Sequence, residues 1–181
     1  ASMTKAITSA AVMSLIEDGK VSLDDPLSKH LPDFAKRRVL ISVDGDSTET
    51  VPVVREPTIH DLLTHRSGLT YGWFGPEKLD AIYNHNKIPN LFEPTDETIG
   101  DRVTRIAEVP LKFQPGAAWE YGVSTDVLGR VVEVASGLTL EQFFRERFFR
   151  PLKMEDTFFY VPENKQSRLA GMFRVNEKGK L

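Results

Sequence analysis

The first long apolar segment of the chain covers residues 6–16, where nearly every position is apolar or small, and it is stopped by Glu17-Asp18-Gly19. A helix without a polar stripe is typical of one buried on all sides, and glycine just after a helix favours a left-handed cap. We therefore expect a fully buried helix that ends at Gly19. Because such a helix needs many neighbours, we interpret the chain as an internal piece of a larger protein. A complete small helical domain is the alternative.

Two short apolar segments, residues 39–43 and 50–54, flank Asp44-Gly45 and predict a β-hairpin in which Pro52 confines its strand to an edge. Before them, Asp24-Asp25-Pro26 predicts a short helical turn with proline at its first position. At the far end, residues 169–175 resemble the start of another strand.

Helix signals dominate the middle of the chain. Thr58 with Asp61 and Thr139 with Gln142 predict capping boxes. Helical periodicity covers residues 76–84 and 98–108. An aromatic loop at 71–74 is expected before the first of these helices, and a turn at 113–116 is expected after the second. The most regular helix is expected to begin at a cap formed by Ser124 or Thr125, to end at Gly137, and to precede a cluster of four core phenylalanines: Phe143, Phe144, Phe148 and Phe149.

Composition excludes several classes of function. The 181 residues include 23 Lys and Arg against 26 Asp and Glu, a net charge of −3, so no cationic surface indicates nucleic acid as a partner. The chain has no cysteine, which rules out disulfides, thiol nucleophiles and cysteine-bound zinc. No apolar segment reaches the ~20 residues of a membrane span. Localisation stays open between cytoplasmic and exported, because we do not take Ala1 as the natural start.

The candidate chemistry begins at Ser2-Met3-Thr4-Lys5. On a helix this spacing places hydroxyl and amine on one face, with Cβ atoms ~5–6 Å apart. Serine needs a base to become a nucleophile, and lysine serves as one when burial lowers its pKa, which the apolar helix is expected to provide. The first turn of a helix also favours an oxyanion. The alternative for these four residues is a capped helix start with a solvated lysine.

A series of segments covers almost the whole chain: Ser2-Met3-Thr4-Lys5, residues 17–26, residues 62–69, Phe113-Gln114-Pro115-Gly116, Tyr121-Gly122-Val123-Ser124, Gly137 and residues 151–157. In this order they resemble the motifs of the serine β-lactamase-like superfamily: class C β-lactamases, DD-peptidases and, most closely, family VIII carboxylesterases. The Asp44-Gly45 hairpin and residues 73–97 look particular to this protein.

The resemblance implies the β-lactamase/transpeptidase-like fold, an α/β (α+β) arrangement in which a helical domain lies against a mixed domain with an antiparallel sheet. Residues 1–20 would be the interface helix, residues 21–150 the helical domain with a hairpin insertion near 38–54, and residues 151–181 the return toward the sheet. The remaining N-terminal strands and the C-terminal strand with the family's third motif would be partners from the same polypeptide.

The same resemblance implies catalytic roles. Ser2 would be the acylated nucleophile, Lys5 its base or proton partner, and Tyr121 the phenol that passes a proton to the leaving group. The family's Tyr-x-Asn motif ends here in Val123, which cannot hydrogen-bond the acylamide of a β-lactam or peptide. Val123 therefore favours simple ester substrates, as in family VIII esterases.

Other candidates are weaker. Tyr71, Trp73 and Trp119 are candidate substrate-binding residues, for which packing is the competing interpretation and is slightly favoured for Trp119. His60 and His65, five residues apart, do not form a metal-ligand pattern and are expected to be structural, whereas His30 and His85 are expected at the surface.

We therefore predict a serine hydrolase that cleaves small-molecule carboxylic esters through an acyl-serine intermediate, without metal or organic cofactor. The alternatives are a β-lactamase or DD-peptidase, an acyltransferase that uses the same acyl-enzyme, and, in a different class, an inactive relative that acts as a binding module.

Overall fold

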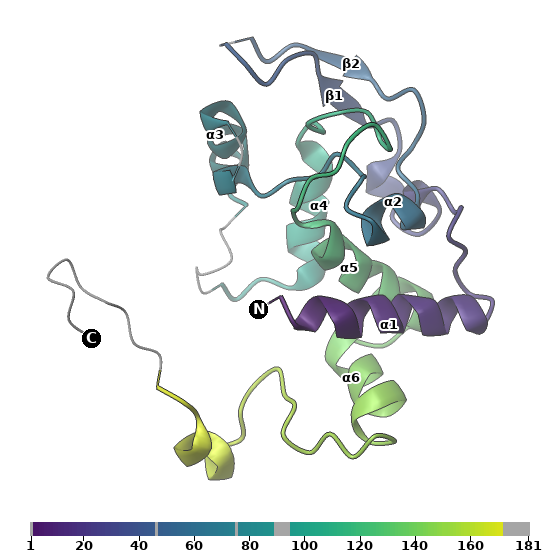
Figure 1. Ribbon diagram of the computed structural model, residues 1–181, viewed down its shortest axis with the longest axis vertical. Helices are drawn as coiled ribbons and strands as arrows, with labels where there is room; N and C mark the ends of the chain where they lie inside the picture. Colours follow the sequence, from purple (N-terminus) through teal and green to yellow (C-terminus); the bar gives the residue numbers. More distant parts are fainter. Residues whose placement is uncertain (1, 46, 75, 89–94, 172–181) are drawn as a thin grey trace, which may run out of the picture.

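The computed structural model describes residues 2–45, 47–74, 76–88 and 95–171 (Figure 1). Its helices and strands follow in the order α1 (Thr4–Glu17), β1 (Arg38–Leu40), β2 (Thr50–Pro52), α2 (Ile59–Leu63), α3 (Glu77–His85), α4 (Ile99–Glu108), α5 (Ser124–Ser136) and α6 (Leu140–Phe144). Short helical turns lie between them: η1 (Leu27–Lys29), η2 (Pro32–Phe34), η3 (Gly72–Phe74), the π-helical η4 (Arg145–Phe149) and η5 (Glu163–Arg168). None of the helices in these ranges is long and apolar enough to cross a membrane.

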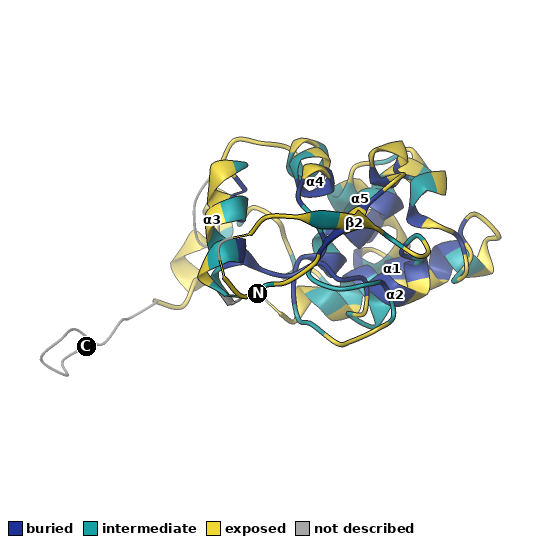
Figure 2. Cartoon of the chain, turned by 90° about the horizontal axis from the view of Figure 1, so that it is seen from above, coloured by how far each residue is buried: buried dark blue, intermediate teal, exposed yellow. Residues whose placement is uncertain are grey.

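Helix α5 is the centre of the hydrophobic core. Its Val127, Leu128, Val131 and Val132 are fully buried, and α1, α2, α4 and α6 all pack against it. Figure 2 shows the buried residues gathered where α1, α2 and α5 meet. Helix α1 is therefore fixed by its packing along α5.

Helix α1 is buried on one face only. Ala11, Val12 and Leu15 face the core, whereas Ala6, Ala10 and Met13 are exposed. The prediction of a helix buried all round is wrong for this chain, because the described neighbours, α5 and α6, cover a single side. The predicted left-handed cap is confirmed, since Gly19 has φ +70°.

The predicted hairpin is confirmed, with shorter strands than expected. Strands β1 and β2 pair antiparallel through Arg38↔Pro52, Val39↔Val51 and Leu40↔Thr50. On its other side β1 bonds to Leu111, whose N–H donates to the Arg38 carbonyl at 2.9 Å and whose carbonyl accepts from Leu40 N–H at 3.0 Å. Pro52 therefore lies on the edge strand, where its missing N–H costs no ladder bond.

The capping predictions are confirmed at Thr58 and Thr139, and α4 has a third capping box at Thr98. The prediction for α5 is wrong, because Val123 occupies the N-cap position without a side-chain cap. Ser124 does not cap the helix, since its hydroxyl bonds instead with the Ser67 hydroxyl at 2.9 Å.

The C-terminal half follows the predicted pattern until residue 151. Gly137 is left-handed with φ +75°, and Phe143, Phe144 and Phe149 belong to the core, with Phe148 packed against it. The turn η5 has no counterpart among the predicted elements. The predicted strand at 169–175 lies mainly outside the described residues.

The segment after α1 differs from its prediction in two details. Pro26 precedes η1 as its N-cap and is not its first residue. His30 is not a surface residue, because its side chain is 8% exposed and its Nε2 lies 2.9 Å from the Asp25 carboxylate. The polar residues around His30 suggested a surface position, but one of them, Asp25, is the partner that allows the histidine to be buried.

Candidate active site

The start of α1 presents a hydroxyl and an ammonium one turn apart. Ser2 precedes the N-cap residue Met3, and its carbonyl accepts the Lys5 N–H at 3.1 Å, which closes the first turn. Ser2 is exposed and Lys5 is half-buried. Helical spacing alone therefore brings these two predicted residues to one place.

Tyr121 arrives at the same place from the segment before α5. Its hydroxyl and the Ser2 hydroxyl share a hydrogen bond of 2.7 Å across 119 positions of sequence. Lys5 Nζ lies 4.9 Å from the centroid of the Tyr121 ring and 6.0 Å from that of Tyr71. The structure thus gathers Ser2, Lys5 and Tyr121 into one group, with Tyr71 as a second phenol beside the ammonium.

The residues on both sides of Tyr121 hold it in place. The Glu120 carboxylate accepts bonds from Lys112 Nζ at 2.8 Å and from the Thr70 hydroxyl at 2.9 Å, and its N–H donates to the His65 carbonyl at 2.9 Å. Gly122 lies so close to Thr70 that an added Cβ would approach its Cα to 2.5 Å. Only glycine allows this close approach of two backbones.

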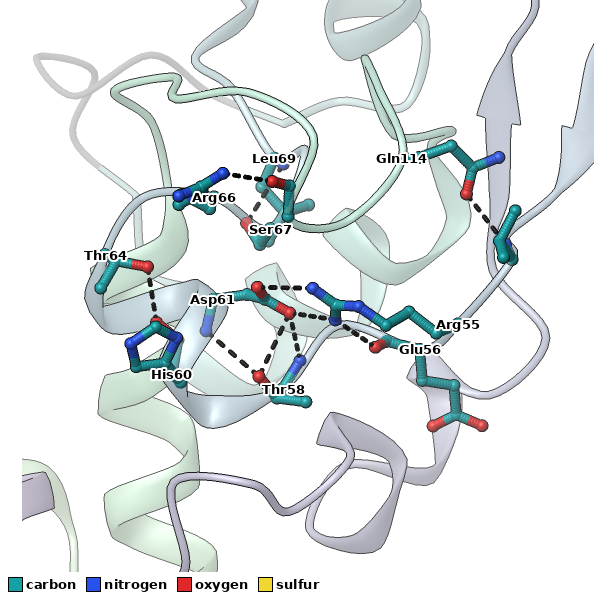
Figure 3. A network of polar contacts seen from close by, with 12 residues as sticks. Arg55, Glu56, Thr58, His60, Asp61, Thr64, Arg66, Ser67, Leu69 and Gln114 are labelled. Carbon is teal, nitrogen blue, oxygen red and sulfur yellow. Dashed lines mark hydrogen bonds and ion pairs between the residues drawn. The ribbon is translucent and has the colours of Figure 1, made fainter.

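The loop that contacts Tyr121 is itself anchored by the capping box of α2 (Figure 3). Asp61 accepts bonds from Arg55 Nη2 at 3.0 Å and from Thr58 N–H at 2.9 Å, while its carbonyl accepts Arg66 N–H at 2.7 Å. This network fixes the chain on either side of His65, the ring next to Tyr121.

The electrostatics of the group raise the pKa of Lys5 and lower the pKa of Tyr121. Burial lowers the pKa of Lys5, but hydrogen bonding to the Tyr121 and Tyr71 hydroxyls outweighs it and leaves the pKa raised. Hydrogen bonds from Ser2 and then Lys5 lower the pKa of Tyr121. The expectation of a lowered Lys5 pKa is therefore wrong, because the two phenols stabilise its charged form and outweigh the effect of burial.

Asp126, in the first turn of α5, belongs to this electrostatic group and was not predicted from the sequence. Burial raises its pKa, while the charges of Lys5 and Arg102 oppose that rise. Burial and then the negative charge of Asp126 raise the pKa of Tyr71, whereas at Tyr121 the same charge only partly opposes the lowering by Ser2 and Lys5. An acid in the first turn of a helix is ordinary in sequence, so only its charge interaction with Lys5 distinguishes it.

His65 lies against Tyr121 in an unusual backbone conformation. Its φ is +55°, and its ring centroid is 5.1 Å from that of Tyr121 and 6.2 Å from that of Trp119. Burial, followed by the charge of Lys5, lowers the pKa of His65, so its neutral form is favoured. Non-glycine residues in this region of φ are uncommon and often lie at functional sites.

The weaker candidates divide by exposure. Tyr71 is 1% exposed and stacks on half-buried Trp73 at 4.7 Å, whereas Val123 is 6% exposed and packs in the core. The side chain of Val123 is therefore not offered to a ligand. Trp119 is 65% exposed and its ring lies beside those of His65 and Tyr121, so its assignment as a substrate-binding residue stays a prediction.

The remaining histidines carry no site. His60 and His85 are exposed, and residues 2–45, 47–74, 76–88 and 95–171 contain no group of three or more His, Asp or Glu that could hold a metal ion. The polar group around Ser2 instead brings together a hydroxyl, a phenol and an ammonium, the kinds of group between which protons can pass.

Comparisons with known proteins place the chain among similar sequences and structures. A family model described as Beta-lactamase matches residues 1–180. The chain is 38% identical to the lovastatin esterase of Penicillium rubens and 37% identical to esterase EstB of Burkholderia gladioli, over 95% and 90% of this chain and 42% and 38% of those proteins. The structure resembles that of EstCE1, "a hydrolase with promiscuous acyltransferase activity", with a TM-score of 0.70 and 29% identity over 89% of this chain and 39% of the other.

These matches confirm the predicted β-lactamase/transpeptidase-like fold, of which the described residues form a mostly helical part with one small sheet. The chain spans about two-fifths of the length of the curated relatives that it matches. By the family model across 1–180 and the identity to two esterases, the chain belongs to the beta-lactamase family.

Proposed function

We propose that the protein hydrolyses carboxylic esters through an acyl intermediate on Ser2. The observation that carries this proposal is the 2.7 Å hydrogen bond between the Ser2 and Tyr121 hydroxyls beside the Lys5 ammonium. A serine within hydrogen-bond reach of a group that can take its proton is the requirement for a serine nucleophile. Two relatives named as esterases support the same chemistry.

In this proposal Tyr121, as phenolate, is the base. It takes the Ser2 proton while Ser2 Oγ forms a bond to the ester carbonyl carbon, and it then gives that proton to the alcohol oxygen as the carbon–oxygen bond breaks. The Lys5 ammonium stabilises the phenolate and keeps the pKa of Tyr121 low. Water then attacks the acyl carbon while Tyr121 takes its proton, and Tyr121 returns that proton to Ser2 Oγ as the acyl carbon–Oγ bond breaks and the acid is released.

Val123 supports esters over β-lactams or peptides as substrates. The position two residues after Tyr121 has an apolar side chain packed in the core, so it has no amide with which to hold an acylamide group. A site without that hydrogen bond favours substrates that do not need one.

Acyl transfer is the second candidate, because the structurally similar EstCE1 is a hydrolase that also has acyltransferase activity. An alcohol that attacks the acyl-serine in place of water would take up the acyl group from the same intermediate.

The proposal includes the predicted division of the chain into an interface helix, a helical domain and a return toward a sheet. Other parts of the polypeptide would then supply the sheet and the third motif.

The test is hydrolysis of short-chain p-nitrophenyl esters and of a chromogenic cephalosporin by the full-length protein. Ester turnover should exceed cephalosporin turnover, and Ser2→Ala and Tyr121→Phe should each lower kcat/KM for the ester by about 100-fold or more. Tyr160→Phe, at an exposed tyrosine, is the matched control and should retain full activity. Faster cephalosporin turnover would favour a β-lactamase, and full ester turnover by Ser2→Ala would reject the acyl-serine.

A further inference from the structure

Four aromatic rings form a continuous row through the proposed site. Trp119 lies nearly parallel to Tyr121 with centroids 6.4 Å apart, Tyr121 meets Tyr71 edge-on at 5.6 Å, and Tyr71 stacks on Trp73 at 4.7 Å. Tyr121, which bonds to the nucleophile, is therefore flanked by another aromatic ring on either side.

The two flanks differ in exposure. Tyr71 is 1% exposed, so its ring is covered by protein and has no face free for a ligand. Trp119 is 65% exposed, which leaves most of a large flat apolar side chain open to solvent beside Tyr121. Among the rings in contact with Tyr121, the indole of Trp119 is thus the open one in the described part of the chain, since His65 is half-buried.

The proposed chemistry determines which part of a substrate lies near the Trp119 indole. Tyr121 donates its proton to the alcohol oxygen as that alcohol leaves, so the alcohol oxygen must lie within hydrogen-bond distance of the Tyr121 hydroxyl, roughly 2.6–3.2 Å. The first atoms of the alcohol group then lie next to the Tyr121 hydroxyl, on a ring whose centroid is 6.4 Å from that of Trp119. The acyl group, in contrast, stays bonded to Ser2 Oγ.

We propose that the Trp119 indole binds the alcohol part of the ester and selects esters of flat aromatic or cyclic alcohols. The inference rests on the proposed acyl-serine hydrolysis. An indole gives a flat alcohol a large apolar surface and an offset-stacked contact, whereas a small alkyl alcohol covers little of it.

This assignment has a kinetic signature. The alcohol leaves when the acyl-enzyme forms, so a residue that contacts only the alcohol affects acylation and has no effect on deacylation. Trp119 should therefore alter kcat/KM for esters with a flat alcohol, while the acyl-enzyme formed from any acetate ester should decay at an unchanged rate.

The experiment compares 2-naphthyl acetate with ethyl acetate, which share the acyl group, on the full-length protein and its Trp119→Ala and Trp119→Phe variants. We expect Trp119→Ala to lower kcat/KM for the naphthyl ester by about 10-fold and for the ethyl ester by less than about 2-fold. Trp119→Phe should recover most of the loss. The acetyl-enzyme should decay equally fast in all three proteins.

Equal losses for both esters, or slower decay of the acetyl-enzyme in Trp119→Ala, would overturn the inference, because Trp119 would then support Tyr121 or contact the acyl group. Failure of the proposed function has a different signature. The unaltered protein would then form no acetyl-enzyme on Ser2 with either ester, and both proposals would fall together.

Discussion

Lys5 and Tyr121 each stabilise the charged form of the other, and this pairing determines how activity should depend on pH. The phenolate exists above the pKa of Tyr121, which the Ser2 and Lys5 hydrogen bonds place below its ordinary 10.0. The ammonium persists up to a pKa above the ordinary 10.5 of lysine. The two groups titrate as a coupled pair, so the measured values belong to the pair.

We therefore expect kcat/KM for a p-nitrophenyl ester to rise with pH through the lowered pKa of Tyr121 and to fall only where the ammonium of Lys5 is lost. Lys5→Met removes the charge that stabilises the phenolate, so the rising limb should move to higher pH and the maximum should fall. Lys20→Met, at an exposed lysine, is the control and should leave the profile unchanged. A rising limb at the same pH in Lys5→Met would contradict the pairing.

His65 has both a ring contact with Tyr121 and a left-handed backbone conformation. One substitution distinguishes the effect of the ring from that of the backbone. Asparagine adopts this backbone region readily, so His65→Asn should keep the loop while removing the ring next to Tyr121. We expect kcat/KM to fall about 10-fold with little change in Tm. Lys36→Asn, at another left-handed residue with φ +56°, should leave both quantities unchanged. Full activity in His65→Asn would show that the ring does not position Tyr121.

At this scale the sequence predicts part of the site. The Ser-x-x-Lys spacing places Ser2 and Lys5 together by helix geometry alone, whereas Tyr121 enters only through the resemblance, because no local pattern connects positions 119 residues apart. The direction of the Lys5 pKa was not predictable, since it depends on two phenols from other segments outweighing burial. Asp126 was missed for the same reason.

At the scale of elements, the junction between residues 69–70 and Gly122 determines where Tyr121 lies. Gly122→Ala would place Cβ 2.5–2.6 Å from the Thr70 backbone, so one of the two segments must move. We expect a fall in kcat/KM of about 10-fold or more and a lower Tm. The control is Gly100→Ala in α4, where the added Cβ meets the flexible Arg130 side chain at 3.3 Å and should be tolerated. Equal effects of the two substitutions would contradict this role of the junction.

Elements with local signals were predictable and those fixed by tertiary partners were not. Capping boxes need only four consecutive residues, so Thr58 and Thr139 were identified correctly. Ser124 was misassigned as a possible cap because its hydroxyl bonds to Ser67, 57 positions away. The turn η5 is held by Asp156, which bonds to Lys165 and Arg168, and single charged residues give no such signal in sequence.

At the scale of the molecule, Asp25 connects the segment after α1 to the start of α2. Its carboxylate pairs with Lys29 at 2.7 Å and His30 at 2.9 Å, and its carbonyl accepts Ile59 N–H at 3.2 Å. Burial would raise the pKa of Asp25, but these hydrogen bonds, with one from Ser22, lower it to about 2. The folded protein therefore stabilises the charged carboxylate of Asp25 relative to the unfolded protein.

Because this pKa is lowered on folding, the stabilisation is present above the pKa of about 4 of an unfolded aspartate and is lost as pH falls toward about 2. Asp25→Asn should lower the free energy of unfolding by about 1–3 kcal/mol at neutral pH and should flatten its dependence on pH in the acid range. Denaturant unfolding at several pH values measures both. Asp24→Asn, at the exposed neighbour, is the control. An unchanged acid dependence in Asp25→Asn would contradict the assignment.

The apolar sequence of α1 predicted burial on every side, and the described chain covers only the face toward α5 and α6. The apolar pattern of a sequence indicates how many faces of a helix are apolar, but it does not identify the element that packs on each face. The division of the chain at residues 20 and 150 likewise stays a prediction. The order of motifs, by contrast, was sufficient to predict the family and the fold.

The central claim is that Ser2 becomes acylated with the help of Tyr121, and intact-mass spectrometry of the full-length protein after brief exposure to a fluorophosphonate or a p-nitrophenyl ester tests it most directly. The account predicts one added acyl or phosphonyl mass that maps to Ser2, is absent from Ser2→Ala and forms far more slowly in Tyr121→Phe. Equal labelling of Ser2→Ala and the unaltered protein would contradict it.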